Sequence, residues 1–222
     1  DVELSESIKP ISTQINAKAT EIIAKQAAKQ HAFFVYLSTD YVFDGKNGMY
    51  KENDHTHPLG VYGKTKLDGE KSLSRLDSEW CIIRTSTPFG IHKKKKSFPI
   101  WVKENLERKK KIKVVDDQIT SPTYLPNLSK MIIEICERKI LGIIHLSGAT
   151  RISRYDLAIL VAEGLELNKK LIIPTKTHKM QWKAPRPKDS SLDISHGSEI
   201  LNEKPMKIDK SLKLFFSELQ NN

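Results

Sequence analysis

The sequence feature that most constrains the fold is an unbroken apolar run, Phe33 to Leu37, that ends in Ser38, Thr39 and Asp40. A strand with one solvated face alternates apolar and polar residues, so this run predicts a strand that is buried on both faces. Such strands are typical of parallel sheets covered by helices. Polar side chains at the carboxyl end of the strand then lie where open α/β sheets bind ligands.

Helical and strand-like segments alternate through the first two thirds of the chain. Residue spacing predicts helices at 11–30, 62–76, 100–109 and 127–138, and further strands at 80–84, 112–115 and 142–146. This alternation indicates βαβ units and a parallel sheet. We therefore expect an α/β, Rossmann-like parallel sheet with helices on both faces.

The pattern weakens after Leu146. A helix from Ser153, a short strand at 171–173, a loop at 174–192 and a final helix at 208–219 are expected there. We therefore predict a sheet-containing region at residues 1–146. Residues 147–222 would mostly form a small carboxyl-terminal lobe that covers a substrate, with a soft boundary across which elements interleave.

Composition excludes several classes of protein. No apolar run is long enough to cross a bilayer, and the acidic, polar start does not match a secretory signal. Cys81 and Cys136 lie in segments that are expected to be buried, which favours a reducing compartment and a cytoplasmic location. His55 and His57 have no third ligand at metal spacing, so no metal site is expected.

The chain is basic, because 37 Lys and Arg residues exceed 27 Asp and Glu residues and leave a net charge of +10. Much of the excess lies in two runs, Lys93–Lys96 and Arg108–Lys111. This balance favours anionic partners such as nucleotides, although a solvated surface is the commoner origin of such runs. The absence of a zinc-finger, basic-zipper or ribonucleoprotein motif argues against a nucleic-acid partner.

A glycine-rich dinucleotide loop is absent from the sequence. Dinucleotide-binding α/β domains usually open with a strand, a glycine-rich turn and a helix that receives the pyrophosphate. No G-x-G-x-x-G occurs here, and the chain begins with a polar segment that leads into a helix. We therefore expect the amino-terminal βα units of such a domain to be missing from this chain.

Tyr62 and Lys66 are four residues apart on a predicted helix, so both side chains are expected on one face. An ammonium beside a phenol lowers the pKa of the tyrosine, which can then exchange a proton with an alcohol or carbonyl oxygen. A hydroxyl of Ser38 or Thr39 could polarise the same carbonyl. These groups favour hydride transfer from a nicotinamide, although Y-x-x-x-K alone often marks only a half-buried tyrosine and an exposed lysine.

Several segments resemble the dTDP-4-dehydrorhamnose reductase family, a branch of the extended short-chain dehydrogenase/reductases. They occur in the family's order and span nearly the whole chain: FVYLSTDYVFDG, PLGVYGKTKLDGEK, IIRTS, VVDDQITSPTY, GIIHLSG, ISRYDLA and RPKDSSLD. Sugar-nucleotide dehydratases are expected to place a glutamate after the Thr-Asp pair, where this chain has Tyr41. The resemblance therefore implies reduction of a nucleotide-linked 4-keto sugar.

The resemblance also implies roles for the catalytic group. Tyr62 would donate the proton, Lys66 would hold the nicotinamide ribose and tune Tyr62, and Thr39 would polarise the sugar carbonyl. Ser38 would lie beside the cofactor, which is expected to be NADPH or NADH. Asn16 would lie behind the lysine, with an ordinary polar helix residue as the alternative.

Other implied positions surround the substrate and the nicotinamide. Thr85 and Ser86 match the loop beneath the nicotinamide. Asp40 and Tyr41 would face the sugar, although Asp40 could instead stabilise a turn. Arg186 would lie near the substrate pyrophosphate, with an ordinary surface arginine as the alternative. Thr87 stands where relatives often place the tryptophan that packs on the sugar, which leaves the sugar open.

The same family pattern includes a regulatory subunit of methionine adenosyltransferase, which works by binding a partner enzyme. A non-catalytic role with that partner is therefore the alternative to a reductase. Because the glycine-rich unit is missing, we expect weak cofactor binding and an inactive chain on its own. Exposed sheet surface would also favour association, for example as a homodimer.

Overall fold

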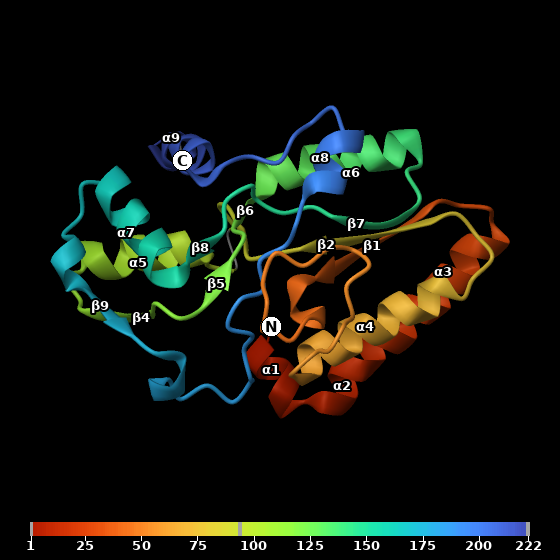
Figure 1. The fold of residues 1–222 in the computed structure, drawn as a ribbon, viewed down its shortest axis with the longest axis horizontal. Helices are drawn as coiled ribbons and strands as arrows, with labels where there is room; N and C mark the ends of the chain where they lie inside the picture. Colours follow the sequence, from red (N-terminus) through yellow and green to blue (C-terminus); the bar gives the residue numbers. More distant parts are fainter. Residues whose placement is uncertain (1, 93–94, 221–222) are drawn as a thin grey trace.

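The computed structural model describes residues 2–92 and 95–220, and shows a three-stranded parallel sheet (Figure 1). Its order is β1 (Phe34–Thr39), β2 (Trp80–Thr85) and β7 (Gly142–His145). The register pairs Thr39 with Thr85 and places Arg84 between Ser38 and His145. The polar ends of the strands therefore lie side by side, and the parallel sheet predicted from the apolar run is confirmed.

Helices cover both faces of this sheet (Figure 1). One face carries α4 (Val61–Ser74) and α3 (Thr20–Lys29), and the other carries α6 (Leu125–Arg138) and α8 (Ser195–Ile200). Successive side chains of a strand point to opposite faces, so Ile82 packs with Leu73 of α4 while Ile83 packs with Met131 of α6. The α/β class with two helical layers is confirmed.

The amino-terminal helix predicted at 11–30 is interrupted by a wider turn. The segments α1 (Val2–Ser7) and α2 (Lys9–Thr13) lead into a π-helical turn, η1 (Gln14–Ala19), before α3 begins. Turns of this kind are rare and occur often at functional sites. Asn16, a predicted site residue, lies in this turn.

The second region, which we call the lobe, is built from short elements. It pairs β3 (Pro88–Phe89) with β6 (Thr123–Tyr124), β4 (Ile112–Val115) with β9 (Ile172–Thr175), and β5 (Ile119–Thr120) with β8 (Ile152–Ser153). The helices α5 (Phe98–Glu107), α7 (Arg154–Gly164) and α9 (Ile208–Gln220) complete it. Phe89, Val102, Leu157 and Phe215 form part of its separate apolar core.

The chain passes between the two regions more than once. After β2 it enters the lobe, and it returns to the sheet through α6 and β7 before it leaves again. Elements from 88–124 therefore pack with residues beyond 146, and the division of the chain near residue 146 stays a prediction. Residues 116–126, for which the sequence predicts no helix or strand, contain β5 and β6. The loop predicted at 174–192 contains the end of β9 and a short 3₁₀ turn, η4 (Thr177–Lys179). Strands of two residues leave no detectable periodicity.

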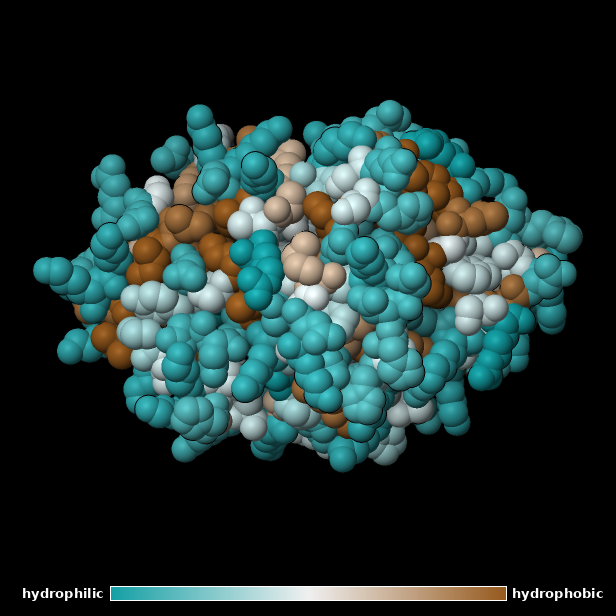
Figure 2. All heavy atoms as spheres, viewed as in Figure 1, coloured by the Kyte–Doolittle hydropathy of each residue, from teal (hydrophilic) through white to brown (hydrophobic). Residues whose placement is uncertain are grey.

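One prediction about burial is wrong. Cys81 is buried in β2, but Cys136 is exposed. The helix α6 buries Leu128, Met131 and Ile135, and Cys136 falls outside that apolar stripe. The face seen in Figure 2 carries hydrophobic atoms in separate patches among hydrophilic ones. Within the described residues, no helix combines the length and the apolar character needed to span a bilayer.

Candidate active site

A cavity of about 810 Å³ lies between the carboxyl end of the sheet and the lobe. This volume is typical of small-molecule sites. Thr39, Asp40, Tyr41 and Tyr62 line it from the sheet side. The lobe and the loop before α8 contribute further lining residues, which include Thr87, Phe98, Trp101, Lys113, Arg154, Trp182 and Arg186.

The end of β1 is held by hydrogen bonds around Asp40. The Thr39 hydroxyl donates to Asp40 Oδ1 (3.0 Å) and accepts from the backbone N–H of Tyr41 (3.2 Å). Hydroxyls of Ser86 and Ser190 donate to Asp40 Oδ2 at 2.8 and 2.6 Å. Burial raises the pKa of Asp40, and these hydroxyls act in the opposite direction. Asp40 therefore stabilises the local turn and also lines the cavity, and its contact with a sugar stays a prediction.

Tyr62 lies in the first turn of α4, with its ring edge-to-face against Tyr41 at a centroid distance of 6.0 Å. Burial raises its pKa, a hydrogen bond with Thr39 lowers it, and the charge of Asp40 raises it. The expected lowering by Lys66 is therefore wrong for this structure. A raised pKa keeps the phenol protonated at neutral pH, which is the state that a proton donor requires.

Lys66 follows one turn later on α4, but its ammonium lies 3.9 Å from the centroid of the Tyr36 ring. The cation is attracted to the ring face, which explains why it does not turn toward Tyr62. Burial lowers the pKa of Lys66 to about 8, while Glu70 raises it. Thr39 and Tyr62 line the cavity and Lys66 does not, so the expectation that all three surround one oxygen is only partly met.

Asn16 is linked to the ring that contacts this lysine, and its role at the cofactor stays a prediction. Its carbonyl oxygen accepts from the Tyr36 hydroxyl (3.0 Å), and its side-chain amide donates to Thr65 Oγ1 on α4 (3.1 Å). The Tyr36 hydroxyl also lies 3.3 Å from the carbonyl oxygen of Lys66. Asn16 therefore connects the π-helical turn to the ring that supports Lys66.

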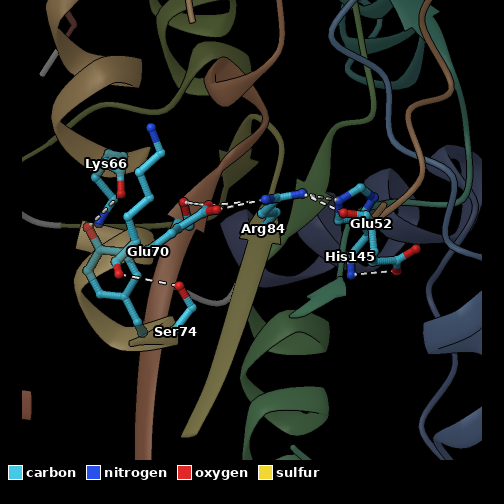
Figure 3. A network of polar contacts seen from close by, with 9 residues as sticks. Glu52, Lys66, Glu70, Ser74, Arg84 and His145 are labelled. Carbon is cyan, nitrogen blue, oxygen red and sulfur yellow. Dashed lines mark hydrogen bonds and ion pairs between the residues drawn. The ribbon is translucent and has the colours of Figure 1, made fainter. Parts of the chain in front are cut away.

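A buried polar network fills the space between α4 and the sheet (Figure 3). Arg84 donates to both carboxylate oxygens of Glu70, from Nε at 3.0 Å and from Nη2 at 2.7 Å. Its remaining amino group donates to the backbone oxygen of Glu52 (3.1 Å) and lies 3.5 Å from His145 Nε2. Ser38 donates to Glu70 Oε1 at 2.5 Å, which turns this predicted cofactor residue toward the network.

His145 closes the other end of this network. Its backbone N–H donates to a Glu52 carboxylate oxygen (2.9 Å), and its Nδ1 lies 3.0 Å from the carbonyl oxygen of Tyr50. Burial lowers the pKa of His145 to about 4, so the ring is neutral at physiological pH. Sequence reasoning did not identify Glu70 or Arg84, although a lone arginine inside an apolar strand signals a buried carboxylate partner.

The loop after β2 is tightly held. The hydroxyl of Thr85 contacts Thr123 Oγ1 at 3.4 Å, and Thr123 donates to the carbonyl oxygen of Ser86 at 2.6 Å. Thr87 has a φ of 42°, which is strained for a β-branched residue. Its backbone oxygen accepts from the N–H of Thr123 (3.2 Å). Strain of this kind clusters at ligand sites, and Thr87 lines the cavity.

Two arginines reach the cavity from its other sides. Arg186 stacks on Trp182, with 4.1 Å from its guanidinium carbon to the ring centroid, and donates to Glu3 (2.9 Å). Arg154, the first residue of α7, lies 4.9 Å from the Phe98 ring. Sequence reasoning singled out Arg186 but missed Arg154, because nothing local separates Arg154 from the chain's other basic residues.

No metal site is evident in the described part of the chain, where no three His, Cys, Asp or Glu side chains cluster suitably. Of the lysine run at 93–96, Lys95 and Lys96 line the cavity, and Lys93 and Lys94 lie outside the described residues. Lys96 pairs with Glu104 at 2.6 Å.

Comparison with known proteins finds relatives along the whole chain. The family model described as RmlD substrate binding domain matches residues 1–221. A dTDP-4-dehydrorhamnose reductase of Aggregatibacter actinomycetemcomitans is 35% identical over 214 residues, which are 90% of this chain and 71% of that protein. The methionine adenosyltransferase 2 subunit beta of Xenopus laevis is 32% identical over 200 residues, which are 87% of this chain and 60% of that protein.

A solved structure is also similar to this chain. The crystal structure of a dTDP-4-dehydrorhamnose reductase from Bacillus anthracis in complex with NADP superposes with a TM-score of 0.92 at 27% identity. The superposition covers 98% of this chain and 77% of the other. The chain thus spans about three quarters of the two reductases' length and less than two thirds of the adenosyltransferase subunit's length.

Proposed function

Because the chain belongs to the RmlD substrate binding domain family, we propose that it acts in an NAD(P)H-dependent reduction of a nucleotide-linked 4-keto sugar. The observation that carries this proposal is the single cavity that Thr39 and Tyr62 share at the carboxyl end of the sheet. The relative named dTDP-4-dehydrorhamnose reductase supports this substrate class.

In the proposed reaction, Tyr62 donates its phenolic proton to the carbonyl oxygen of the sugar. Burial keeps that phenol protonated, so the proton is available at neutral pH. The Thr39 hydroxyl can rotate from Asp40 toward the same oxygen, which polarises the carbonyl before reduction. The hydride that completes the reduction to the alcohol would come from NADPH or NADH when bound.

Lys66 fits the role of holding the ribose of NADPH or NADH. Its ammonium carries three N–H donors, yet among the described residues it makes no hydrogen bond or ion pair: it contacts the Tyr36 ring and is affected by the charge of Glu70. These free donors are available to ribose hydroxyls. Asn16 and Tyr36 would support the lysine from behind, and Thr85 and Ser86 would form the floor beneath the nicotinamide. We assign Ser38 to Glu70 in place of direct cofactor binding.

The two regions divide this work in our proposal. The sheet region would hold the cofactor and supply Thr39, Tyr62 and Lys66. The lobe would cover the nucleotide sugar, with Arg186 and Thr87 at the cavity wall. Thr87 stands where relatives often place a tryptophan, and its smaller side chain would leave room for a sugar of a different shape.

The test is reduction of dTDP-4-dehydrorhamnose by the whole protein, followed through consumption of NADPH. Tyr62→Phe removes the proton donor and should lower kcat by about 10²- to 10⁴-fold. Tyr155→Phe, a half-buried tyrosine of the lobe core outside the cavity, is the matched control and should keep full activity. Full activity of Tyr62→Phe would refute the mechanism.

A second candidate is a non-catalytic subunit of a methionine adenosyltransferase, favoured by the 32% identity to the Xenopus laevis subunit. Ile11, Ile15, Ile22 and Ile23 of α2, η1 and α3 are 49–63% exposed and offer an apolar surface for a partner or a second copy. Co-elution with a methionine adenosyltransferase would favour this role. Elution alone, as a monomer or a homodimer with reductase activity, would favour the first.

A further inference from the structure

Arg154 occupies an unusual position for a charged residue. It begins α7, directly after the Ser153 cap, and its backbone N–H donates to the carbonyl oxygen of Gln118 (3.0 Å). Its half-buried side chain lies against the Phe98 ring and lines the cavity. The guanidinium is therefore held at the cavity wall by the start of a helix and by a ring, which leaves its donors free.

The guanidinium of Arg154 has no hydrogen-bonded partner within residues 2–92 and 95–220, although Tyr41 and Asp40 lie near enough to act on its charge. It makes no hydrogen bond and no ion pair there, and its contact with the Phe98 ring is a cation–π contact that uses none of its N–H donors. Asp40 is a nearby carboxylate, but the hydroxyls of Thr39, Ser86 and Ser190 already occupy its oxygens. An arginine carries five N–H donors, and those of Arg154 have no protein acceptor among the described residues, so they are available to a ligand in the cavity.

Arg186 presents a second incompletely bonded guanidinium to the same cavity. One of its amino groups donates to Glu3, but its Nε is buried and has no partner within the described chain. Burial lowers the pKa of Arg154, and the positive charge of Arg186 lowers it further, so the two cations act on each other. Two like charges at one cavity repel, and an anion that bonds both would remove the repulsion.

We propose that Arg154 and Arg186 together bind the diphosphate of the substrate, with Arg154 as a binding residue that the family resemblance does not assign. The planar fork of a guanidinium matches two phosphate oxygens, and two guanidiniums match the two negative charges of a diphosphate. This inference rests on the proposed function for the identity of the ligand as a nucleoside diphosphate sugar. It adds which side chains anchor that ligand.

The test is calorimetric binding of dTDP to the whole protein without cofactor. Arg154→Met should weaken dTDP binding by about tenfold or more. The affinity of Arg154→Lys for dTDP should lie between those of Arg154→Met and the wild type. Arg108→Met removes the same charge from the exposed end of α5, outside the cavity, and should bind dTDP normally. Thymidine, which lacks phosphate, should show the same affinity for Arg154→Met as for the wild type.

The outcomes separate this proposal from the reductase proposal. Three results would overturn the diphosphate site. They are unchanged affinity of Arg154→Met for dTDP, an equal loss of affinity for thymidine in that variant, and no dTDP binding by the wild type. Binding does not require Tyr62, so an active Tyr62→Phe enzyme would refute the mechanism and leave the site intact. Should Arg154→Met fail to fold, Arg154→Lys keeps the charge and the stem and decides the question alone.

Discussion

Two arginines in this molecule, Arg84 and Arg154, lie in opposite kinds of surroundings. Arg84 is buried inside the sheet region, where Glu70, the carbonyl oxygen of Glu52 and His145 surround its guanidinium (Figure 3). Arg154 lies at the cavity between the sheet and the lobe, with the Phe98 ring as its support. The first has its partners in the folded chain, and the second keeps donors available.

This difference separates charges that hold the fold from charges that await a ligand. A buried ion pair with full hydrogen bonding is destabilising to break but contributes little that an external molecule could use. An incompletely bonded cation at a cavity gains most of its interaction energy when an anion arrives. The comparison predicts that changes at Arg84 alter folding, while changes at Arg154 alter binding.

The largest expected effect is on stability. Arg84→Met leaves the buried Glu70 carboxylate without its cation and should lower the free energy of unfolding by about 3–5 kcal/mol. Arg154→Met removes no ion pair and should change it by no more than about 1 kcal/mol. Urea denaturation followed by circular dichroism measures both. Equal losses of unfolding free energy for the two variants would contradict the distinction between Arg84 and Arg154.

The next effect is a pH dependence at Lys66, a third cation with free donors. Its pKa of about 8 means that the ammonium is charged below pH 8 and neutral above it. If the charged form holds the cofactor, kcat/KM for NADPH should be level below pH 8 and fall about tenfold per pH unit above it. Lys66→Arg should move this fall to higher pH, because a guanidinium does not titrate there. A level profile to pH 10 in the wild type would contradict the role.

The lowered pKa of Lys66 has the opposite effect on folding stability, which should rise with pH where cofactor binding falls. The folded-state pKa of Lys66 lies below its ordinary value of 10.5, so between these values the unfolded chain binds more protons. Stability contributed by this group therefore rises as the pH increases from about 8 to 10.5. Loss of cofactor affinity above pH 8 would thus occur without any loss of folding from Lys66.

The smallest effect concerns backbone strain at the cavity wall. Thr87→Asn places a residue that tolerates the left-handed region at φ 42° and should raise the free energy of unfolding by about 1 kcal/mol. Met49, with a φ of 46° in an exposed turn outside the cavity, is the matched position. Met49→Asn should stabilise without changing KM for the sugar nucleotide, whereas Thr87→Asn should change that KM. An unchanged KM for Thr87→Asn would remove Thr87 from the substrate wall.

Much of the sheet region could be predicted from local patterns. The apolar run of β1 and the isoleucine pair of β2 indicated buried parallel strands, and both strands form as expected. The lobe was harder to predict, because strands of two residues carry no periodicity and pair with segments far away in the chain. The π-helical turn at Asn16 also left no local signal.

The sequence by itself determined the fold class and which residue types meet at the carboxyl end of the sheet, because local spacing encodes which faces are buried. It placed Thr39 after a buried strand and Tyr62 at the start of a helix, and the two line one cavity. Only the tertiary structure decided the partners of the charges. Glu70 reaches Arg84, Lys66 turns to Tyr36, and Arg154 stays unbonded. Such partners depend on distances between segments remote in the chain, and no local pattern records those distances.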